Sequence, residues 1–316
     1  MGFNGVVPSV KQTGVRALFL LLMSLLSVGS IFEAGYYVMK HPYQRTRGYF
    51  AIYRAWYSHC PFVAGKVWPH VLARFFEPFV PVWVQVEPGV TMWLDPNDLV
   101  SAAILSSGEW EPLTWHALEP HVSAGGTFVD VGAHIGWYSL KAAKAVGPAG
   151  RVIAIEPNRE TLLTLQGNIR ASGAGAIIMV APVACSDTET TLTFYAASRA
   201  NTGESSLSLA NASQTGQVSG AYPVRARRLD DIVREAGVTR VDVVKIDVEG
   251  AEFLVLEGAA KTLDRYRPVL SVELFDQGLK AMGSSVEEVV AFLHSHGYTR
   301  RQATESNVVF VPVAGP

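Results

Sequence analysis

The chain has 316 residues, a formal net charge of −2 and a pI of about 6.5. This length allows one large domain with an appendage, or two small domains. The near-neutral charge argues against a nucleic-acid scaffold, and the two cysteines, Cys60 and Cys185, are too few and too far apart for a metal cluster or a disulfide framework.

The N-terminal segment contains the longest apolar run of the chain. Residues 17–32 carry no charge, and the apolar character resumes after Glu33. Because a membrane-spanning helix needs about 20 apolar residues, the segment at about 17–39 predicts a membrane anchor within a first unit of residues 1–42. A cleaved signal peptide and a buried or surface-associated helix are the alternatives.

Basic residues flank this apolar segment. They are Lys11 and Arg16 before it and Lys40, Arg45, Arg47 and Arg54 after it. The larger number after the segment favours a cytoplasmic C-terminal domain by the positive-inside rule. We therefore expect a membrane-associated, single-pass protein, with a cytoplasmic protein as the alternative. The aromatic-rich residues 43–80 predict a helical linker, or alternatively an interfacial belt on the bilayer.

An α/β domain is expected over residues 81–316. Its expected elements are a hairpin at 82–87 and 90–94, helices at 97–106, 138–145, 159–171 and 286–296, parallel strands at 127–130, 151–155, 176–180, 241–246 and 269–274, and a closing strand pair at 298–301 and 307–311. This alternation predicts a Rossmann-like, mostly parallel, seven-stranded sheet with an antiparallel terminal strand. The polar segment 196–220 predicts a loop or a mobile lid, and Asp230 predicts a helix N-cap.

The sequence FVDVGAHIGWYS at residues 128–139 contains the first functional pattern. A strand ends in Asp130, a glycine turn runs from Gly132 to Gly136, and the next strand ends in Glu156. Glycines let a ligand approach the backbone closely, and an acid at the end of the second strand can accept two hydrogen bonds from a ribose diol. The pattern predicts a pocket for a nucleoside-bearing cofactor; a plain strand–helix–strand crossover is the alternative.

The spacing of this turn distinguishes between cofactors. Dinucleotide enzymes hold a pyrophosphate with G-x-G-x-x-G, whereas this turn reads D-x-G-x-x-x-G. An acid before the turn suits a ligand with an ammonium group. S-adenosylmethionine carries an ammonium, a sulfonium and a ribose diol, so we expect this cofactor. An NAD(P)-dependent oxidoreductase is the rival interpretation, which the missing Gly-x-Gly pair and the closing strand pair disfavour.

The sequence KIDVEGAE follows the fourth parallel strand and contains the second functional pattern. Ligands of doubly wound sheets bind outside the carboxyl ends of the strands, so we expect Asp247 to face the same crevice as Asp130. Asp247 is the first candidate for a catalytic base or a metal ligand, Glu249 is the second, and His134 is a further candidate base. Glu273, near the end of the fifth strand, is another candidate acid. Alternatively, some of these acids cap helices.

These stretches resemble the FkbM-type family of S-adenosylmethionine-dependent methyltransferases. The resemblance covers about residues 83–311 and rests, in chain order, on LDP at 94–96, GEWEP at 108–112, VDVGAHIGWYS at 129–139, IEPN at 155–158, Leu229-Asp230, KIDVEGAE at 245–252 and SVEL at 271–274. His134 departs from the family, which usually has asparagine at this position.

The resemblance implies methylation of a hydroxyl on a sugar, a glycan or another small molecule. The cofactor-binding residues that it implies are Asp130, Gly132 and Gly136 at the methionine end, Glu156 at the ribose, Asp187 beside the adenine and Glu111 at the closure of the pocket. The expected partner is a small-molecule, glycan or lipid-linked acceptor and no nucleic acid. Transfer to nitrogen and a non-catalytic protein are the alternatives. The sequence leaves metal dependence and oligomeric state open.

Overall fold

A computed structural model describes residues 81–214, 216–304 and 306–313. The expected N-terminal unit, its apolar segment and the aromatic linker all precede residue 81 and lie outside the described residues. Within the described residues, no helix combines the length and the apolar character needed to cross a membrane. We therefore correct the prediction of a single-pass membrane protein: the described residues contain no span that supports it, and it is not carried further.

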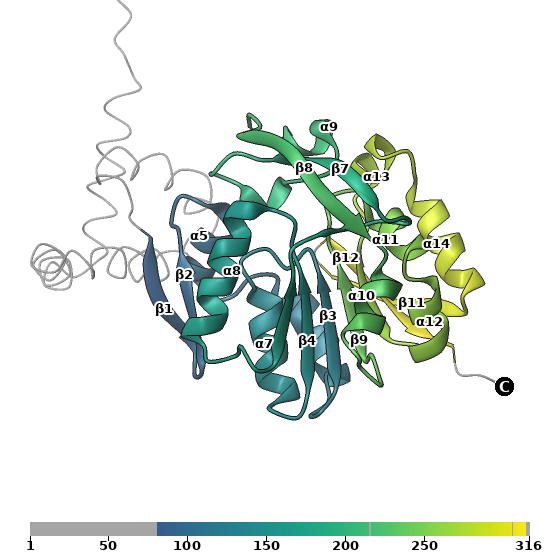
Figure 1. Cartoon of the computed structure of the whole chain (residues 1–316), viewed down its shortest axis with the longest axis horizontal. Helices are drawn as coiled ribbons and strands as arrows, with labels where there is room; N and C mark the ends of the chain where they lie inside the picture. The colour runs from purple at the N-terminus through teal and green to yellow at the C-terminus, as the bar shows by residue number, and fades with distance from the viewer. Residues whose placement is uncertain (1–80, 215, 305, 314–316) are drawn as a thin grey trace, which may run out of the picture. The chain divides into compact units, whose positions relative to one another are not determined.

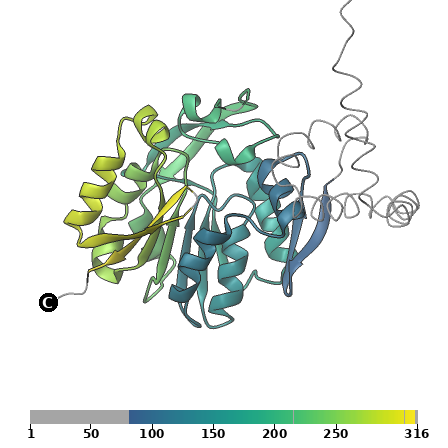
Figure 2. The same ribbon diagram turned by 180° about the vertical axis from the view of Figure 1, so that it is seen from behind.

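A seven-stranded sheet forms the centre of the fold (Figure 1). In spatial order its strands are β11 (Tyr298–Ala303), β12 (Asn307–Pro312), β10 (Val269–Glu273), β9 (Val243–Ile246), β3 (Thr127–Val131), β4 (Arg151–Ile155) and β5 (Ile178–Ala181). The strands from β10 to β5 pair in parallel, and β12 pairs antiparallel with both of its neighbours. The predicted sheet is confirmed, with the terminal strand pair at one edge (Figure 2).

Both faces of the large sheet are buried, which explains why its strands read as continuous apolar runs. Successive residues of a strand point to opposite faces, so Val129 and Val131 pack into one hydrophobic core and Phe128 packs into the other. Val152 on β4 joins the same core as Phe128, and Ile153 joins the core of Val129. The two cores hold the central strands in place, so the ends of these strands are rigid supports for a site.

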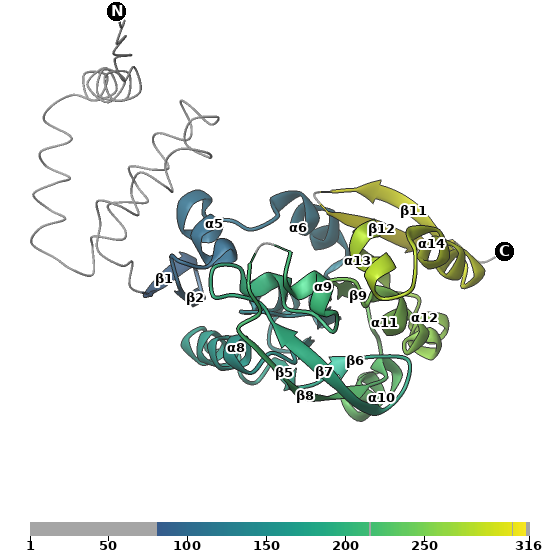
Figure 3. The same cartoon turned by 90° about the horizontal axis from the view of Figure 1, so that it is seen from above.

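Helices cover both faces of the sheet. The first face carries the β1 (Val82–Glu87) and β2 (Val90–Leu94) hairpin with α5 (Leu99–Ser107), α6 (Pro112–Leu118), α7 (Trp137–Val146) and α8 (Arg159–Ala171). The second face carries α10 (Leu229–Glu235), α11 (Glu252–Glu257), α12 (Ala260–Tyr266), α13 (Asp276–Ala281) and α14 (Val286–Ser295). Viewed from above, the β1–β2 hairpin and the β11–β12 pair lie at opposite ends (Figure 3).

A three-stranded sheet, which the sequence analysis does not predict, lies over one end of the large sheet (Figures 1 and 3). Its spatial order is β6 (Ala184–Cys185), β8 (Gly220–Arg227) and β7 (Thr190–Ala196). The predicted loop over 196–220 overlaps these strands only at its first and last residues, Ala196 and Gly220. β8 lacks a strand signal because it contains Pro223 and arginines on its exposed side.

The middle of the predicted loop contains two short helical turns. They are η2 (Thr202–Glu204) and α9 (Leu209–Ala212). The residues between these two turns are attached to β7, because Ser206 exchanges two backbone hydrogen bonds with Tyr195 of β7. This segment is therefore held against the small sheet.

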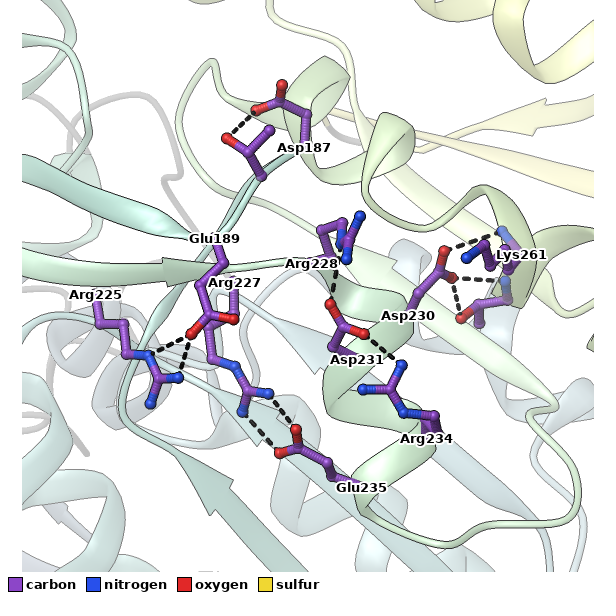
Figure 4. A network of polar contacts seen from close by, with 12 residues as sticks. Asp187, Glu189, Arg225, Arg227, Arg228, Asp230, Asp231, Arg234, Glu235 and Lys261 are labelled. Carbon is purple, nitrogen blue, oxygen red and sulfur yellow. Dashed lines mark hydrogen bonds and ion pairs between the residues drawn. The ribbon is translucent and has the colours of Figure 1, made fainter.

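Asp230 does not cap α10, so the prediction that it is the N-cap of this helix is wrong. It lies inside the first turn of α10, and its carboxylate accepts hydrogen bonds from the backbone nitrogens of Lys261 at 3.1 Å and Thr262 at 2.7 Å (Figure 4). Asp230 thus satisfies free N–H groups at the start of α12 instead of those of its own helix. A cap between two helices cannot be recognised from local spacing.

Candidate functional site

The order of strands reverses between β3 and β9. The chain runs outward through β3, β4 and β5 on one side, and through β9 and β10 on the other. In such sheets, ligands bind outside the carboxyl ends of the strands at this reversal. A cavity of about 290 Å³ lies there, lined by the turn after β3, the end of β4, β6, the 202–207 segment and the loop after β9. This cavity is the candidate site.

Gly132 lets the turn after β3 pack closely against the loop after β9. Its φ is +83°, and a Cβ atom there would overlap the backbone oxygen of Asp247 and lie 2.9 Å from its carbonyl carbon. The backbone nitrogens of Gly132 and Ala133 both donate to the oxygen of Ile155 at 3.0 Å. A glycine is therefore required here by conformation and by space. Gly132 lines the cavity.

Gly136 has a packing role, and its predicted contact with a cofactor stays a prediction. It precedes α7 with a φ of +93°, and a Cβ atom there would lie 2.6 Å from the Cδ1 atom of Leu165 on α8. It is not among the residues that line the cavity. Close packing of α7 against α8 therefore accounts for this glycine.

Glu156 directly follows β4 and lines the cavity while it is almost fully buried. Its Oε2 atom accepts a hydrogen bond from the backbone nitrogen of His134, and its Oε1 atom accepts one from that of Asn158, both at 2.7 Å. These bonds orient the carboxylate and leave each oxygen with further acceptor capacity. Burial raises the pKa of Glu156 to about 7, although both backbone donors lower it. The arrangement can accept two hydrogen bonds from a diol.

Glu111 lines the cavity from the start of α6, where its φ is +42°. Its Oε2 atom accepts hydrogen bonds from the Tyr138 hydroxyl at 2.8 Å and from the Asn307 Nδ2 atom at 3.4 Å. Glu111 thereby connects α6, α7 and β12. Burial, followed by the charge of Glu111, raises the pKa of Tyr138. The predicted pocket-closing residue is thus positioned at the cavity wall by side chains of two other elements.

Lys245 places a buried ammonium group among the acids, and no role for this residue is predicted from the sequence. Its Nζ atom donates to the Oδ2 atom of Asp247 at 2.7 Å and lies 4.5 Å from the centre of the Tyr138 ring. Burial opposes the charged form, but Asp247 and Asp130 together raise the pKa of Lys245. Lys245 therefore remains a cation. A lysine within the apolar strand β9 is the signal that could have identified it.

Asp130 lies behind the cavity wall, and its predicted contact with a cofactor stays a prediction. It is 1% exposed and does not line the cavity. Its Oδ2 atom accepts a hydrogen bond from the Ser139 hydroxyl at 2.6 Å, and its Oδ1 atom has no hydrogen-bond partner in the described part of the chain. It pairs in register with Lys245 across β3 and β9. Its position suits a counter-charge for Lys245.

Three carboxyl groups meet in the cavity after β9 and β10. Asp247, Glu249 and Glu273 each bring one carboxylate oxygen to within 4.8 Å of the others. Burial, followed by the charge of Asp247, raises the pKa values of Glu249 and Glu273. The structure therefore brings both predicted acids of the second motif together with the additional candidate from β10.

Glu252 holds the turn that carries these acids. Its Oε1 atom accepts hydrogen bonds from the backbone nitrogens of Val248 at 3.0 Å and Gly250 at 3.2 Å. Glu252 therefore accepts hydrogen bonds from backbone N–H groups just before α11, as the alternative of helix capping expects. Asp247 and Glu249 instead line the cavity.

His134 lines the cavity and is held by a hydroxyl group. Its Nε2 atom lies 2.7 Å from the Thr202 hydroxyl oxygen, and that hydroxyl donates to the Oδ1 atom of Asp98 at 2.7 Å. Because the only hydroxyl proton goes to Asp98, the Nε2 atom carries the proton of a neutral ring and the Nδ1 atom is left as an acceptor. Burial lowers the pKa of His134.

Asp187 does not line the cavity, and its predicted place beside an adenine stays a prediction. Its carboxylate accepts a hydrogen bond from the Ser186 hydroxyl at 2.9 Å, and it lies near the ion pairs of β8 and α10 (Figure 4). Ala184 and Cys185 of β6 line the cavity instead. The chain leaves the cavity after β6 because β6 pairs with β8.

The family model of the methyltransferase FkbM domain matches residues 130–300. A curated relative, the AMB antimetabolite synthetase AmbE of Pseudomonas aeruginosa, is 27% identical over 199 residues, which cover 54% of this chain and 9% of that protein. The chain thus spans less than a tenth of the length of this relative.

Two solved structures are also similar. The methyltransferase FkbM from Methylobacillus flagellatus KT is 20% identical with a TM-score of 0.41, over 67% of this chain and 52% of that chain. The O-methyltransferase TomG from Streptomyces achromogenes, solved in complex with SAM, is 14% identical with a TM-score of 0.39, over 64% of this chain and 78% of that chain. The chain therefore spans about half of the first of these structures.

Proposed function

Because this chain belongs to the FkbM methyltransferase domain family, we propose that it transfers the methyl group of S-adenosylmethionine to a hydroxyl oxygen of an acceptor. The observation that carries the proposal is the position of Glu156 and Gly132 in one cavity at the reversal of strand order. Glu156 offers two oriented acceptor oxygens for a ribose diol. The cofactor is bound, in this proposal, across the carboxyl ends of β3 and β4.

The remaining walls of the cavity suit the other parts of this cofactor. Ala184, Cys185 and Phe194 form an apolar wall that would contact the adenine. The turn at Gly132 allows close approach of the methionine end to the backbone. Asp130 would act on this end only through Lys245, since its carboxylate is covered.

Methyl transfer requires the acceptor oxygen, the methyl carbon and the sulfur in line. The oxygen forms the new bond to carbon, the carbon–sulfur bond breaks with its electron pair left on sulfur, and the hydroxyl proton passes to a base. Asp247 is the proposed base, with Glu249 as the second candidate, because both face the cavity. The Nδ1 atom of His134 is a further acceptor. The proposed acceptor class is a small-molecule, glycan or lipid-linked hydroxyl compound.

Binding of S-adenosylmethionine to the full-length protein tests the proposal first. Calorimetric titration should give a dissociation constant in the micromolar range, and labelled methyl should then be transferred to hydroxyl compounds in a screen of sugars, glycans and small molecules. A folded protein that does not bind S-adenosylmethionine would refute the proposed cofactor. Label found on an amine would replace oxygen by nitrogen as the acceptor atom.

The affinity for S-adenosylmethionine should increase with pH. Burial raises the pKa of Glu156 to about 7, and a diol needs the ionised carboxylate, which predominates only above that pKa. Binding should therefore be about tenfold weaker at pH 6 than at pH 8 and should level off above that range. Calorimetric titration across this range measures the effect.

Two variants separate this effect from the titration of the ligand itself. Glu156→Gln places an amide NH2 group against one of two backbone donors, so it should weaken binding and remove the pH dependence that Glu156 causes. Glu160→Gln, an exposed acid in the first turn of α8, should behave like the unchanged protein. Equal pH profiles for all three proteins would show that Glu156 does not hold the ribose.

A further inference from the structure

The acid cluster of Asp247, Glu249 and Glu273 has a feature that the proposed base does not explain. The Oε2 atom of Glu273 is buried and has no hydrogen-bond partner among the residues that the structure describes, and Glu273 as a whole is 9% exposed. A buried carboxylate oxygen without a donor is costly unless a cation or a ligand satisfies it. One carboxylate oxygen of each of the three residues lies within 4.8 Å of the others, and all three residues line the cavity, so a ligand in the cavity is within reach of the Glu273 side chain.

We propose that Asp247, Glu249 and Glu273 bind one divalent cation of the Mg²⁺ or Mn²⁺ type, which orients the acceptor hydroxyl. The binding of the ion stands on the cluster alone, whereas its role in orienting the acceptor rests on the proposed methyl transfer. The cluster offers oxygen ligands only, which these hard cations prefer.

The spacing of the cluster fits such an ion. Ligands at about 2.1 Å from an octahedral ion lie about 3 to 4 Å apart, and the three carboxylate oxygens already lie within 4.8 Å of one another. Small side-chain rotations would complete the contacts. Three protein ligands leave three positions of an octahedron for water and for the acceptor oxygen, which is typical of magnesium sites.

Among the residues that the structure describes, a single cationic side chain contacts the three acids of the cluster. Lys245 donates to Asp247 and is the only cationic side chain whose contact with the cluster is observed within the described residues. Glu252 and Glu204 add further negative charge near Glu249. A divalent ion would relieve the repulsion among these carboxylates at short distance, where Coulomb energies in a buried site are large.

The cluster is also held by the surrounding backbone. Glu249 has a φ of +56°, and its backbone oxygen accepts hydrogen bonds from the Ser206 hydroxyl at 2.7 Å and from the Asn211 Nδ2 atom at 2.8 Å. The backbone on both sides of Glu249 is tied by Glu252. Strained backbone that is fixed by several partners is common at binding sites. The carboxylate of Glu249 is thereby kept at the cavity.

A bound ion changes the path of the proton in the proposed reaction. A cation held by these three residues would lower the pKa of the acceptor hydroxyl, so that its proton would pass to bulk solvent rather than to Asp247. The acceptor oxygen then forms the bond to the methyl carbon as the carbon–sulfur bond breaks. Asp247 and Glu249 act as ligands in this arrangement.

Titration of the full-length, chelator-treated protein with Mn²⁺ tests the inference, with free ion measured by electron paramagnetic resonance. We expect one Mn²⁺ per chain, and binding weakened by at least about tenfold in Glu273→Gln and in Glu249→Gln. Both substitutions keep side-chain shape and remove charge, and circular dichroism checks the fold. Glu257→Gln, an exposed acid on α11 outside the cluster, should bind Mn²⁺ normally.

The outcomes separate the ion site from the proposed reaction. A folded protein that binds S-adenosylmethionine but takes up no Mn²⁺ at millimolar concentration would overturn the ion site and leave the cofactor proposal intact. Binding of Mn²⁺ that neither cluster variant alters would also overturn it. Binding of Mn²⁺ that both variants weaken, in a protein that does not bind S-adenosylmethionine, would support the ion site and refute the cofactor.

Discussion

Replacing Asp247 with asparagine should lower the turnover number for methyl transfer by about 10²- to 10⁴-fold, with little change in the affinity for S-adenosylmethionine. Asp247 faces the cavity beside Glu249 and Glu273, and either as a base or as an ion ligand it needs its negative charge. An asparagine oxygen can still accept the hydrogen bond from Lys245, so the local packing should survive.

Turnover of the Asp247 variant is measured with the first acceptor that the labelled-methyl screen identifies, and cofactor affinity is measured by calorimetry. Asp276→Asn provides a matched control, because Asp276 is an exposed acid paired with Lys280 on α13. This control should retain full turnover. If Asp247→Asn turned over as fast as the unchanged protein, Asp247 would be neither the base nor an ion ligand required for the reaction.

Replacing Gly132 with alanine should destabilise the fold by more than about 3 kcal/mol and abolish binding of S-adenosylmethionine. The added Cβ atom would overlap the backbone oxygen of Asp247, and the φ of +83° is unfavourable for a side chain. Backbone atoms cannot avoid the contact by changing a rotamer, so the ends of β3 and β9 would have to separate. That movement would open the floor of the cavity.

Gly283 offers a control with the same backbone strain and no contact. Its φ is +82°, and a Cβ atom there would meet no atom within 4 Å. Gly283→Ala should cost about 1 kcal/mol and leave cofactor binding unchanged. Urea denaturation measures both free energies of unfolding, and calorimetry measures binding. Equal losses of stability in the two variants would mean that conformation, and not the contact with Asp247, explains the glycine.

The large sheet could be predicted because its signals are local. The hairpin β1–β2, the strand β4 and the helix α8 lie at the predicted bounds, since each is an apolar or amphipathic run between turn or capping residues. The small sheet could not be predicted. Its strand β8 pairs with β7 over residues 220–226 and carries Pro223, so its strand conformation depends on a partner.

The candidate site could be predicted in part. Gly132, Glu156 and Asp247 follow different strands and all line the cavity, because the carboxyl ends of parallel strands share one edge of a sheet. The direction of individual side chains could not be predicted. Asp130 lies one residue before the end of β3 yet is covered, and Asp187 lies beyond β6 and does not line the cavity. Packing and strand pairing decide which way each of these side chains points.

By itself, the sequence determined the alternation of strands and helices and the strand ends where glycine and acidic residues meet a ligand, because periodicity and turn chemistry act over a few residues. Only the tertiary structure decided which charges meet. Lys245 lies beside Asp130 because β9 pairs with β3. Glu273 reaches Asp247 and Glu249 because β10 pairs with β9, and such pairing across the sheet has no local signature in the chain.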